Sequence, residues 1–397
     1  MSALPTSSPT LSYDSAKCRG AHASSQAAMS RTFKAFSMDP KVHVPPQFPG
    51  AVSDASPSTN PRWLGPWWMP AAAVWAAVLA LRHALYDWGV LPSRRGALPT
   101  LVIGNVELGG TGKTPHVLDV AHRLEGLLGE GTVGILSRGY GRTTKGFLWV
   151  KDGETWRDSG DEPWMMQSRL PSVAVAVCED RLHGLERMAT ARPALRVVVL
   201  DDGMQHRTLR PDVLVGLVGR PDAHTWRLLV PAGPFRDLPS RLKRCDHVVD
   251  TSGHHPQFPW SSRTASAPPQ RWARGASDEG ASLSEPALLV TGIARPGRAL
   301  ESAQQHAEVA AHAFYPDHHA YTHADVSHWL AWMKEAGISS LVTTEKDAVR
   351  LRRFEHALED VDLWVLPLTL VWHTEARVQA FLETWTQTLP SQSKPPQ

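Results

Sequence analysis

Six consecutive residues have the types that bind phosphate groups. They are Gly109, Gly110, Thr111, Gly112, Lys113 and Thr114. Glycines let backbone N–H groups turn towards a phosphate, and a helix that follows adds the partial positive charge of its N-terminus. In a P-loop, Lys113 would contact the β- and γ-phosphates and the Thr114 hydroxyl would contact Mg²⁺. The segment therefore predicts binding of ATP with Mg²⁺.

The residues around this segment predict a strand, a glycine-rich loop and a helix. Thr100 to Ile103 is a short apolar run, and Thr114 to Leu128 carries apolar residues at helical spacing. The usual P-loop has a glycine five residues before Gly112, where this chain has Glu107. The alternative interpretation is a glycine-rich turn followed by a chance Lys-Thr pair. The joint occurrence of GKT, the glycines and the strand-helix context favours the P-loop.

An acidic pair follows the most strand-like run of the chain. Arg196 to Leu200 leads directly to Asp201 and Asp202. A strand of bulky aliphatic residues that ends in a carboxylate has the form of a Walker B element, which holds Mg²⁺ directly or through water. Two adjacent carboxylates can also be turn formers. Because a P-loop candidate lies upstream, we favour metal binding for both residues.

One further segment suggests proton transfer, and another opens a predicted helix. In Tyr315-Pro316-Asp317-His318-His319, two adjacent histidines follow an aspartate. One histidine pair without a third ligand is weak evidence for zinc, so proton transfer is the better interpretation. Asp161 in Gly160-Asp161-Glu162-Pro163 opens a predicted helix, where its default role is an N-cap.

Arginines lie in two segments that have the character of loops. Ser137 to Arg142 follows the predicted strand Val133 to Leu136, and ligands bind at the carboxyl ends of strands in open α/β sheets. The basic run Arg241 to Arg244 could receive an anionic group of a substrate. The alternatives are an ordinary polar loop and a solvated basic face.

The length of the chain fits two domains, and its charge balance gives no reason to expect nucleic acid as a partner. A chain of 397 residues is long enough for two substantial cores. Lys and Arg total 41 against 39 for Asp and Glu, so no strong field favours a polyanion. Cys18, Cys178 and Cys245 show no CxxC spacing, which fits a reducing cytosolic location without an obvious disulfide framework or zinc site.

The N-terminal residues 1–62 are expected to form a disordered tail. They are rich in Ser, Pro, Ala and Thr and show almost no apolar periodicity. The segment lacks the basic-then-apolar order of a secretory signal. It is therefore either a tail or upstream sequence read from a misplaced start codon, with Met38 and Met69 as internal candidates.

Residues 63–98 are expected to form a membrane-associated helix. Trp63 to Leu81 contains no charged residue, but Gly65, Pro66 and Pro70 interrupt its first half. About a dozen good helical positions remain, which is short for a membrane span. Trp and Tyr at the ends, with Arg82, Arg94 and Arg95 nearby, suit a helix that lies in or dips into the cytoplasmic membrane face. The alternative is an apolar helix packed on the first domain.

The rest of the chain predicts two α/β domains. Residues 99–250 are expected to form a nucleotide-binding domain, in which Phe147 to Trp156 has the pattern of a β-hairpin around Asp152-Gly153. Residues 251–286 are rich in Ser, Pro, Ala and Gly and are expected to be a linker. Residues 287–397 again alternate strands and helices and form the second, smaller domain.

An ordered series of motifs connects the chain to a known family. The series is GNVELGGTGKTP, SRGYGR, GDEP, EDR, LDDGMQHRTLRPD, LVPAGPFRDLPSRLKR, TGIARPGR, FYPDHHAYT and LVTTEKDAVRL. With these motifs, from about Trp63 to near the C-terminus, the chain resembles the tetraacyldisaccharide 4'-kinases. That family phosphorylates the lipid A precursor of Gram-negative bacteria. A single P-loop is common to many folds, whereas the whole series in this order is highly specific.

The resemblance implies an ATP-dependent lipid kinase at the cytoplasmic face of the inner membrane. The enzyme would convert tetraacyldisaccharide 1-phosphate to lipid IVA in lipopolysaccharide biosynthesis. It would have a P-loop NTPase-like α/β/α domain and a smaller α/β domain, joined by a two-stranded β-ribbon with a returning C-terminal segment. The active site would lie between them. No obligate protein partner is implied.

The resemblance also implies roles for individual residues. Lys113, Thr114 and the Asp201-Asp202 pair would hold ATP and Mg²⁺, and Asp161 would pair with His318 or His319 to abstract a proton. Further motif positions associated with the site are Tyr140, Arg181, Gln205, His206, Arg236 and Asp237. Asp237 stands where the family commonly has Glu, so its carboxylate reaches about one bond less far. The Ser- and Pro-rich linker and residues 1–60 are further departures.

Two other functions compete with the lipid kinase. A soluble P-loop kinase for a small metabolite would leave the Trp-rich segment unexplained. A membrane-attached nucleotide switch of the partition-ATPase type would hydrolyse ATP to control a partner. Such a switch does not need a second domain with a histidine pair and a basic cluster. A product assay separates the lipid kinase from the switch.

Overall fold

The computed structural model of the chain describes residues 48, 50–51, 66–150, 155–219, 228–253, 255, 257–272 and 283–390. Most of the predicted tail over residues 1–62 lies outside these residues. Phe48 is described and is buried, and its ring packs edge-on against Trp332 with 5.9 Å between the ring centroids. Phe48 is therefore part of a core and not of a disordered tail.

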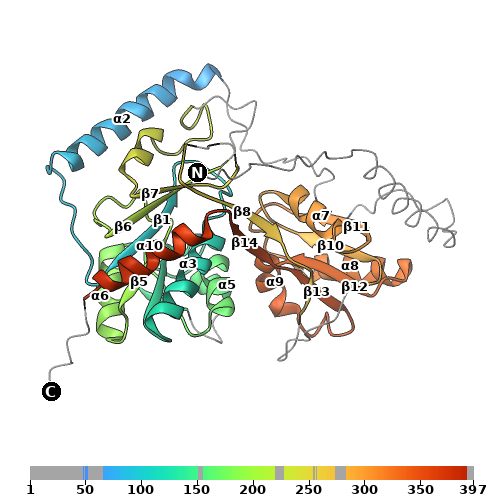
Figure 1. Cartoon of the computed structure of the whole chain (residues 1–397). Coiled ribbons are helices and arrows are strands. Elements are labelled where there is room, and N and C mark those ends of the chain that lie inside the picture. The colour runs from blue at the N-terminus through green and yellow to red at the C-terminus, as the bar shows by residue number, and fades with distance from the viewer. Residues whose placement is uncertain are drawn as a thin grey trace, which may run out of the picture. The chain divides into compact units, whose positions relative to one another are not determined.

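The described chain contains two sheets, both largely parallel (Figure 1). The first has the strand order β14-β8-β7-β6-β1-β5-β2-β4-β3. Its strands are β1 (Thr100–Asn105), β2 (Val133–Ser137), β3 (Leu148–Trp149), β4 (Ala174–Val177), β5 (Val197–Asp201), β6 (Val213–Val218), β7 (His247–Asp250), β8 (Trp260–Ser266) and β14 (Leu368–Trp372). The central strands are buried along their whole length, as expected for parallel strands covered on both faces.

Helices cover both faces of the first sheet, so that its apolar side chains enter two cores. Leu101 and Ile103 of β1 pack with α3 (Lys113–Leu128), α5 (Asp161–Arg169) and α10 (Glu375–Thr388). Val102 of the same strand packs on the opposite face with α2 (Met69–Asp87) and α6 (Arg181–Ala191). This alternation follows from the two-residue period of a strand. Short helices are η1 (Pro66–Trp68), α4 (Trp156–Ser159) and η2 (Pro239–Arg244).

The second sheet has the order β11-β10-β12-β13-β9, and only the edge strand β9 pairs antiparallel. Its strands are β9 (Gln270–Arg271), β10 (Ala287–Thr291), β11 (Val309–Phe314), β12 (Ser340–Thr344) and β13 (Asp362–Leu366). Its helices are α7 (Pro296–Gln304), α8 (His323–Ala336), α9 (Glu345–Leu351) and η3 (Arg352–Phe354). α8 and α7 contribute to separate cores, one on each face.

The chain passes twice between the sheets. It leaves the first sheet through β8, and after β13 it returns through β14, which pairs antiparallel with β8. After this ribbon, α10 packs against α3. α5 of the first sheet and α9 of the second lie side by side (Figure 1). The ribbon and the α5–α9 contact thus determine which residues of the two sheets meet.

The N-terminal apolar segment forms a helix that exceeds the dozen or so favourable positions counted in the sequence but is shorter than the expected range 63–98. α2 has 19 residues, because Pro70 lies in its first turn, where no backbone N–H is needed, and because the helix continues past Arg82 and His83. Its length and composition would suffice to cross a membrane, and 17% of the apolar stretch is buried. The helix therefore packs on the first sheet along one narrow side only, through Ala72 and Leu79.

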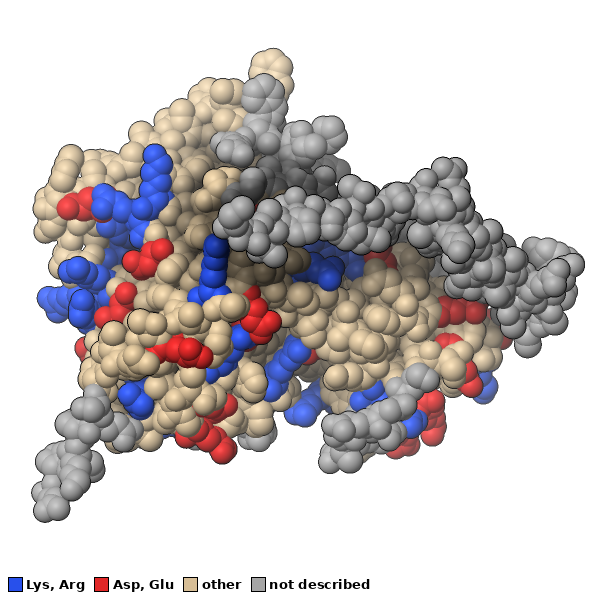
Figure 2. All heavy atoms as spheres, viewed as in Figure 1, with Lys and Arg blue, Asp and Glu red and all other residues tan. Residues whose placement is uncertain are grey.

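The solvent-facing side of α2 is apolar and uncharged up to Leu81. Trp67 of η1 is 91% exposed, and large apolar side chains of α2 are exposed as well. Charged side chains gather instead near the C-terminal end of the helix (Figure 2), where Arg207 and Arg244 bind Asp87 at 2.8 and 3.1 Å. The C-terminal end of α2 is thus attached by ion pairs, while its apolar side remains uncovered among the described residues.

One predicted element is wrong. The expected hairpin over Phe147 to Trp156 does not form, because β3 pairs with β4 and Trp156 begins α4. The turn residues Asp152 and Gly153 lie outside the described residues. A short strand can pair with any available edge, and here β4 offers one.

Candidate active site

The glycine-rich loop lies between β1 and α3 in the predicted order of strand, loop and helix. Gly112 occupies the N-cap of α3 with a left-handed φ of 79°, and a Cβ there would lie 3.3 Å from Thr264 Cγ2. Only glycine fits this position without strain. No side chain caps the helix, so its first backbone N–H groups remain available to an anion.

Polar side chains at the end of β1 hold this loop in place. Asn105, the last residue of β1, donates from Nδ2 to the buried hydroxyl of Thr111 at 2.8 Å. Its Oδ1 accepts a hydrogen bond of 3.3 Å from Lys113 Nζ. The ammonium of Lys113 is therefore held at the start of α3, close to the backbone N–H groups of the loop.

Asp202 is neutralised by cations from the protein itself. Arg236 binds both of its carboxylate oxygens, at 2.8 Å for Nη1 to Oδ2, and Lys113 Nζ lies 3.8 Å from Oδ1. Burial alone would raise the pKa of Asp202, but the Arg236 hydrogen bonds and the Lys113 charge hold it below the usual value. Both oxygens of Asp202 are thus already engaged.

Asp201 has an unused, buried oxygen. Its Oδ2 accepts from the Ser137 hydroxyl at 3.2 Å, whereas Oδ1 has no partner in the described part of the chain. Burial, with the charges of Glu162 and Asp202, raises the pKa of Asp201 to about 7. A buried carboxylate oxygen that lacks a hydrogen-bond donor is suited to a cation.

The fit to Mg²⁺ rests on this one oxygen. Among the described residues, no three His, Cys, Asp or Glu side chains converge into a preformed metal cage. Mg²⁺ seldom needs one, since it keeps several waters and takes one or two carboxylates together with phosphate oxygens. The residues therefore fit Mg²⁺, with Asp201 as the better carboxylate ligand and Asp202 as the partner of Arg236.

A carboxylate of α5 and a histidine of the second sheet form a close pair. The Nδ1–H of His318 donates to Asp161 Oδ2 at 2.8 Å, and Asp161 is 4% exposed. Burial would raise the pKa of Asp161, but the His318 hydrogen bond and the charges of Lys346 and Arg350 lower it to about 2. The same hydrogen bond raises the pKa of His318.

The two adjacent histidines lie in different surroundings. His318 has a left-handed φ of 60°, which directs it away from its own sheet and towards Asp161. His319 stacks on Tyr315 with 4.6 Å between the ring centroids, and its Nε2–H donates to Asp325 at 3.3 Å. Of the two candidates, only His318 contacts Asp161. Asp161 itself is the first residue of α5 and not its N-cap, which is Gly160.

Comparisons with known proteins show the family of the chain. Residues 64–387 match the family model for tetraacyldisaccharide-1-P 4'-kinase. The chain belongs to this family. A tetraacyldisaccharide 4'-kinase of Bacteroides fragilis is 33% identical over 72% of the chain and 82% of the relative, and one of Anaeromyxobacter dehalogenans is 36% identical over 71% and 80%.

A solved structure supports the same assignment. LpxK from Aquifex aeolicus, crystallised in complex with ATP, superposes with a TM-score of 0.65 at 25% identity. The match covers 80% of this chain and 98% of that one. The mixed α/β fold with parallel sheets is therefore the fold of this kinase family.

The other predicted site residues of the kinase differ in how close they lie to this centre. Tyr140 is 73% exposed, and its ring centroid is 5.9 Å from that of His318. Gln205 donates to the backbone oxygen of Asn105 at 2.9 Å, beside the glycine loop. Arg181 is buried, and its charge acts on Asp201 and Asp202. Tyr140 thus lies near His318, Gln205 beside the glycine loop, and Arg181 near the Asp201-Asp202 pair.

Asp237 lies against α2, whereas His206 lies near the N-cap of α6, with 4.0 Å between its Nε2 and Asp180 Oδ1. Burial and the charges of Arg181, Arg82 and Arg138 lower the pKa of His206, and its buried Nε2 has no hydrogen-bond partner in the described chain. Asp237 is buried and accepts from the Nε2–H of His83 at 2.7 Å. The structure thus places Asp237 in the attachment of α2 to the first sheet.

Sequence reasoning missed several residues of this centre. Asn105, Lys346 and Arg350 lie inside the motifs GNVELGGTGKTP and LVTTEKDAVRL, but their types gave no separate signal. The Lys346 ammonium pairs with Glu162, next to Asp161. The position of a residue within a family motif was the one clue available, because these contacts join distant parts of the chain.

His116 was missed as well. Its Nδ1–H donates to the Gly112 carbonyl at 2.6 Å, and its Nε2 accepts from the Ser262 hydroxyl of β8 at 2.8 Å. Burial lowers the pKa of His116 to about 4, so the ring is neutral near pH 7. The side chain therefore connects the glycine loop directly to the ribbon of β8 and β14.

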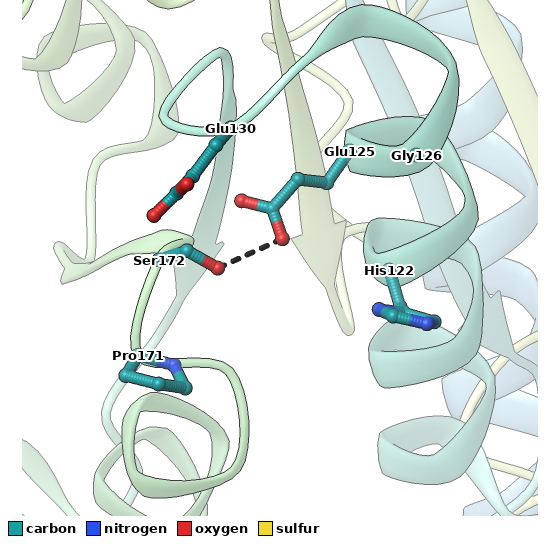
Figure 3. Close-up of a pocket in the computed structure, with 6 residues that line it drawn as sticks. All are labelled: His122, Glu125, Gly126, Glu130, Pro171 and Ser172. Atoms are coloured by element: carbon teal, nitrogen blue, oxygen red, sulfur yellow. Dashed lines mark hydrogen bonds between the residues drawn. The ribbon is translucent and has the colours of Figure 1, made fainter.

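A pocket of about 650 Å³ lies at the other end of α3 (Figure 3). It is lined by His122, Glu125, Gly126, Glu130, Pro171 and Ser172. The Ser172 hydroxyl donates to Glu125 at 2.8 Å. Two carboxylates and no arginine or lysine make the pocket unsuitable for a triphosphate, and it lies apart from the centre around Lys113.

Proposed function

We propose that the protein transfers the γ-phosphoryl group of ATP to the 4'-hydroxyl of a tetraacylated glucosamine disaccharide 1-phosphate. The observation that carries this proposal is the pair of buried Asp161 and half-buried His318, joined by a hydrogen bond near the Asp201-Asp202 carboxylates. Glu162, next to Asp161, acts electrostatically on Asp201, so the two groups belong to one centre. A nucleotide switch would not require the pair.

The glycine loop and Lys113 are proposed to hold the triphosphate as a P-loop does. The uncapped N-terminus of α3 would bind phosphate oxygens, and the Lys113 ammonium would neutralise charge as it moves towards the leaving β-phosphate. Thr114 and Asp201 would hold Mg²⁺, which when bound neutralises charge on the phosphate oxygens. Arg236 keeps Asp202 and Asn105 in place beneath Lys113.

Asp161 and His318 are proposed to receive the proton of the sugar hydroxyl. The new bond forms between the sugar oxygen and the γ-phosphorus, and the bond from that phosphorus to the oxygen of the leaving ADP breaks. A sugar hydroxyl remains protonated at neutral pH, so a base must take its proton as the new bond forms. The lowered pKa of Asp161 and the raised pKa of His318 favour the imidazole as the place where the proton rests.

α2 is proposed to lie in the cytoplasmic face of the inner membrane. Its exposed apolar side, with Trp75 and with Trp67 and Trp68 of the preceding η1, suits the boundary between headgroups and acyl chains. The ion pairs of Asp87 and the His83–Asp237 hydrogen bond would fix this surface relative to the catalytic centre. The acyl chains of the substrate could then stay in the lipid phase while the sugar reaches Asp161.

The decisive experiment is incubation with γ-labelled ATP, Mg²⁺ and tetraacylated disaccharide 1-phosphate. Labelled phosphate on the lipid is the expected result. Release of free phosphate alone would support the nucleotide switch instead. An absence of labelled lipid at saturating ATP with folded protein would disprove the kinase function.

A further inference from the structure

Arg350, a buried arginine of α9, lies close to Asp161 and contacts the backbone next to His318. The Arg350 side chain is 0% exposed. Its Nη1 donates to the backbone oxygens of Gly292 and His319 at 3.1 and 3.3 Å. Its Nη2 lies 3.4 Å from Asp161 Oδ2, the oxygen that also accepts from His318. One guanidinium therefore faces the second sheet on one side and α5 on the other.

The two carbonyls bound by Arg350 determine the turn that carries His318. The backbone N–H of His318 donates to the Gly292 oxygen at 3.1 Å, and His319 directly follows. A left-handed backbone is unfavourable for a residue other than glycine and persists only where its surroundings impose it. By binding both oxygens, Arg350 holds the conformation that directs His318 towards Asp161.

Among the described residues, the second sheet and its helices do not provide a partner for every nitrogen of the Arg350 guanidinium. Asp347, one helical turn away, lies 3.4 Å from Nη1. Its carboxylate is otherwise occupied by donors from Thr291, Gly292, Tyr321 and Thr344. Nη2 makes no hydrogen bond among the described residues. Because a buried charge is costly without a partner, the carboxylate of Asp161 across the contact completes its environment.

We propose that Arg350 is a positioning residue for the proton-transfer step, an inference that rests on the kinase function proposed above. Its planar guanidinium fixes the His318 turn through two carbonyls, and its charge keeps the Asp161 carboxylate turned towards His318 Nδ1. A lysine side chain has a single nitrogen and cannot bind the two carbonyls and the Asp161 carboxylate at once. The pair therefore depends on α9 as well as on its own two residues.

The test compares Arg350→Gln and Arg350→Lys with Arg169→Gln. Arg169 pairs with Glu345 at 2.9 Å between the same two helices, without contacting Asp161 or the His318 turn. It is a matched control for loss of an ion pair between α5 and α9. Arg350→Gln should lower kcat about ten- to a hundredfold, as expected when a reacting group is misplaced by about 1 Å. The KM for ATP should change less than about twofold.

Arg350→Lys and Arg169→Gln should be less affected than Arg350→Gln. Arg350→Lys should recover only part of the lost kcat, and Arg169→Gln should lower kcat by less than about threefold. Equal losses in Arg169→Gln and Arg350→Gln would mean that Arg350 merely holds the helices together, and would overturn the proposal. If Arg350→Gln does not give a folded protein by thermal melting, Arg350→Lys decides, and a parental kcat in that variant rejects the positioning role.

A double variant supplies a second criterion. Because Arg350 acts through the pair, Arg350→Gln should cost little more in a protein that already carries His318→Ala. A full multiplication of the two losses would contradict the inference. Failure of the two proposals can be told apart. A parent protein without labelled lipid refutes the kinase function, whereas an active parent with unchanged Arg350 variants refutes only the role of Arg350.

Discussion

The phosphate side and the proton-transfer side of the centre are built in different ways. Asn105 ends β1, Lys113 begins α3, Asp201 ends β5 and Asp202 directly follows it, so a single sheet places all four. Asp161 and His318 come from the two sheets and meet through α5 and α9. The first group needs only its own sheet, whereas the second also needs the ribbon and the helix contact.

This difference has a functional consequence that we infer from the contacts. Since Asp161 obtains its compensating charges from His318, Lys346 and Arg350, all from the second sheet, its environment is complete only when α9 packs on α5. ATP could bind on the phosphate side without this contact. Coupling of proton transfer to the helix contact would limit wasteful hydrolysis of ATP by water.

The largest expected effect concerns Asp161. Asp161→Asn keeps the shape but removes the charge, so kcat should fall about 10²- to 10⁴-fold, the usual contribution of a general base. The KM for ATP should change little, because the phosphate side is intact. Steady-state kinetics with labelled ATP measures both. Combined with His318→Ala, the loss should scarcely exceed that of the poorer single variant. A full product of the two losses would show independent action.

Lys113→Ala tests the phosphate side. Loss of one preorganised charge-stabilising group should lower kcat at least about a hundredfold. The helix contact should remain, because Lys113 makes no ion pair with the second sheet among the described residues. Thermal melting should therefore match the parent. A near-normal kcat would make the loop a structural turn.

The two histidines should respond differently. His318→Ala should lower kcat about a hundredfold, the lower range for a general base, since it alone contacts Asp161. His319→Ala removes a stacking contact with Tyr315 and a hydrogen bond to Asp325. It should therefore lower the melting temperature while kcat stays close to the parent. Parallel kinetic and melting measurements distinguish them. The reverse ranking of the kcat values would assign the proton to His319.

Membrane attachment should depend on α2 and not on the residues before Phe48. Replacement of Trp67, Trp68 and Trp75 by Ser removes three exposed aromatic side chains and should weaken sedimentation with anionic vesicles severalfold. Deletion of residues 1–47 keeps Phe48 against Trp332 and serves as the control, with binding and kcat close to the parent. Undiminished sedimentation of the Ser variant would make α2 a packing helix only.

The smallest expected effect is on how the stability of the fold depends on pH. The pKa of His318 is raised in the folded state, so its contribution to stability is complete below the unfolded value of about 6.5. This contribution is lost as pH rises through the higher folded value. Melting temperatures of the parent should therefore decline more than those of Asp161→Asn across that range. Parallel curves would mean that the Asp161–His318 hydrogen bond does not stabilise the fold.

The sequence predicted the parts of the centre whose residues are neighbours along the chain. A buried strand, a glycine loop and a helix gave the place of Lys113, and a strand ending in two carboxylates gave Asp201 and Asp202. These elements lie where the sequence predicted them, because local backbone structure alone places such side chains, while the phosphate and metal roles stay predictions. The family motifs added Asp161 and the histidine pair, without indicating which histidine is used.

Only the tertiary structure decided the contacts between distant segments. It turned His318 and not His319 towards Asp161, engaged Asp202 with Arg236, left Asp201 with a free oxygen, and placed Arg350 behind the pair. It also paired β3 with β4 in place of the expected hairpin and extended α2 beyond its apolar run. Periodicity and motif spacing report on neighbours along the chain, whereas these contacts depend on how the ribbon and the α5–α9 packing bring two sheets together.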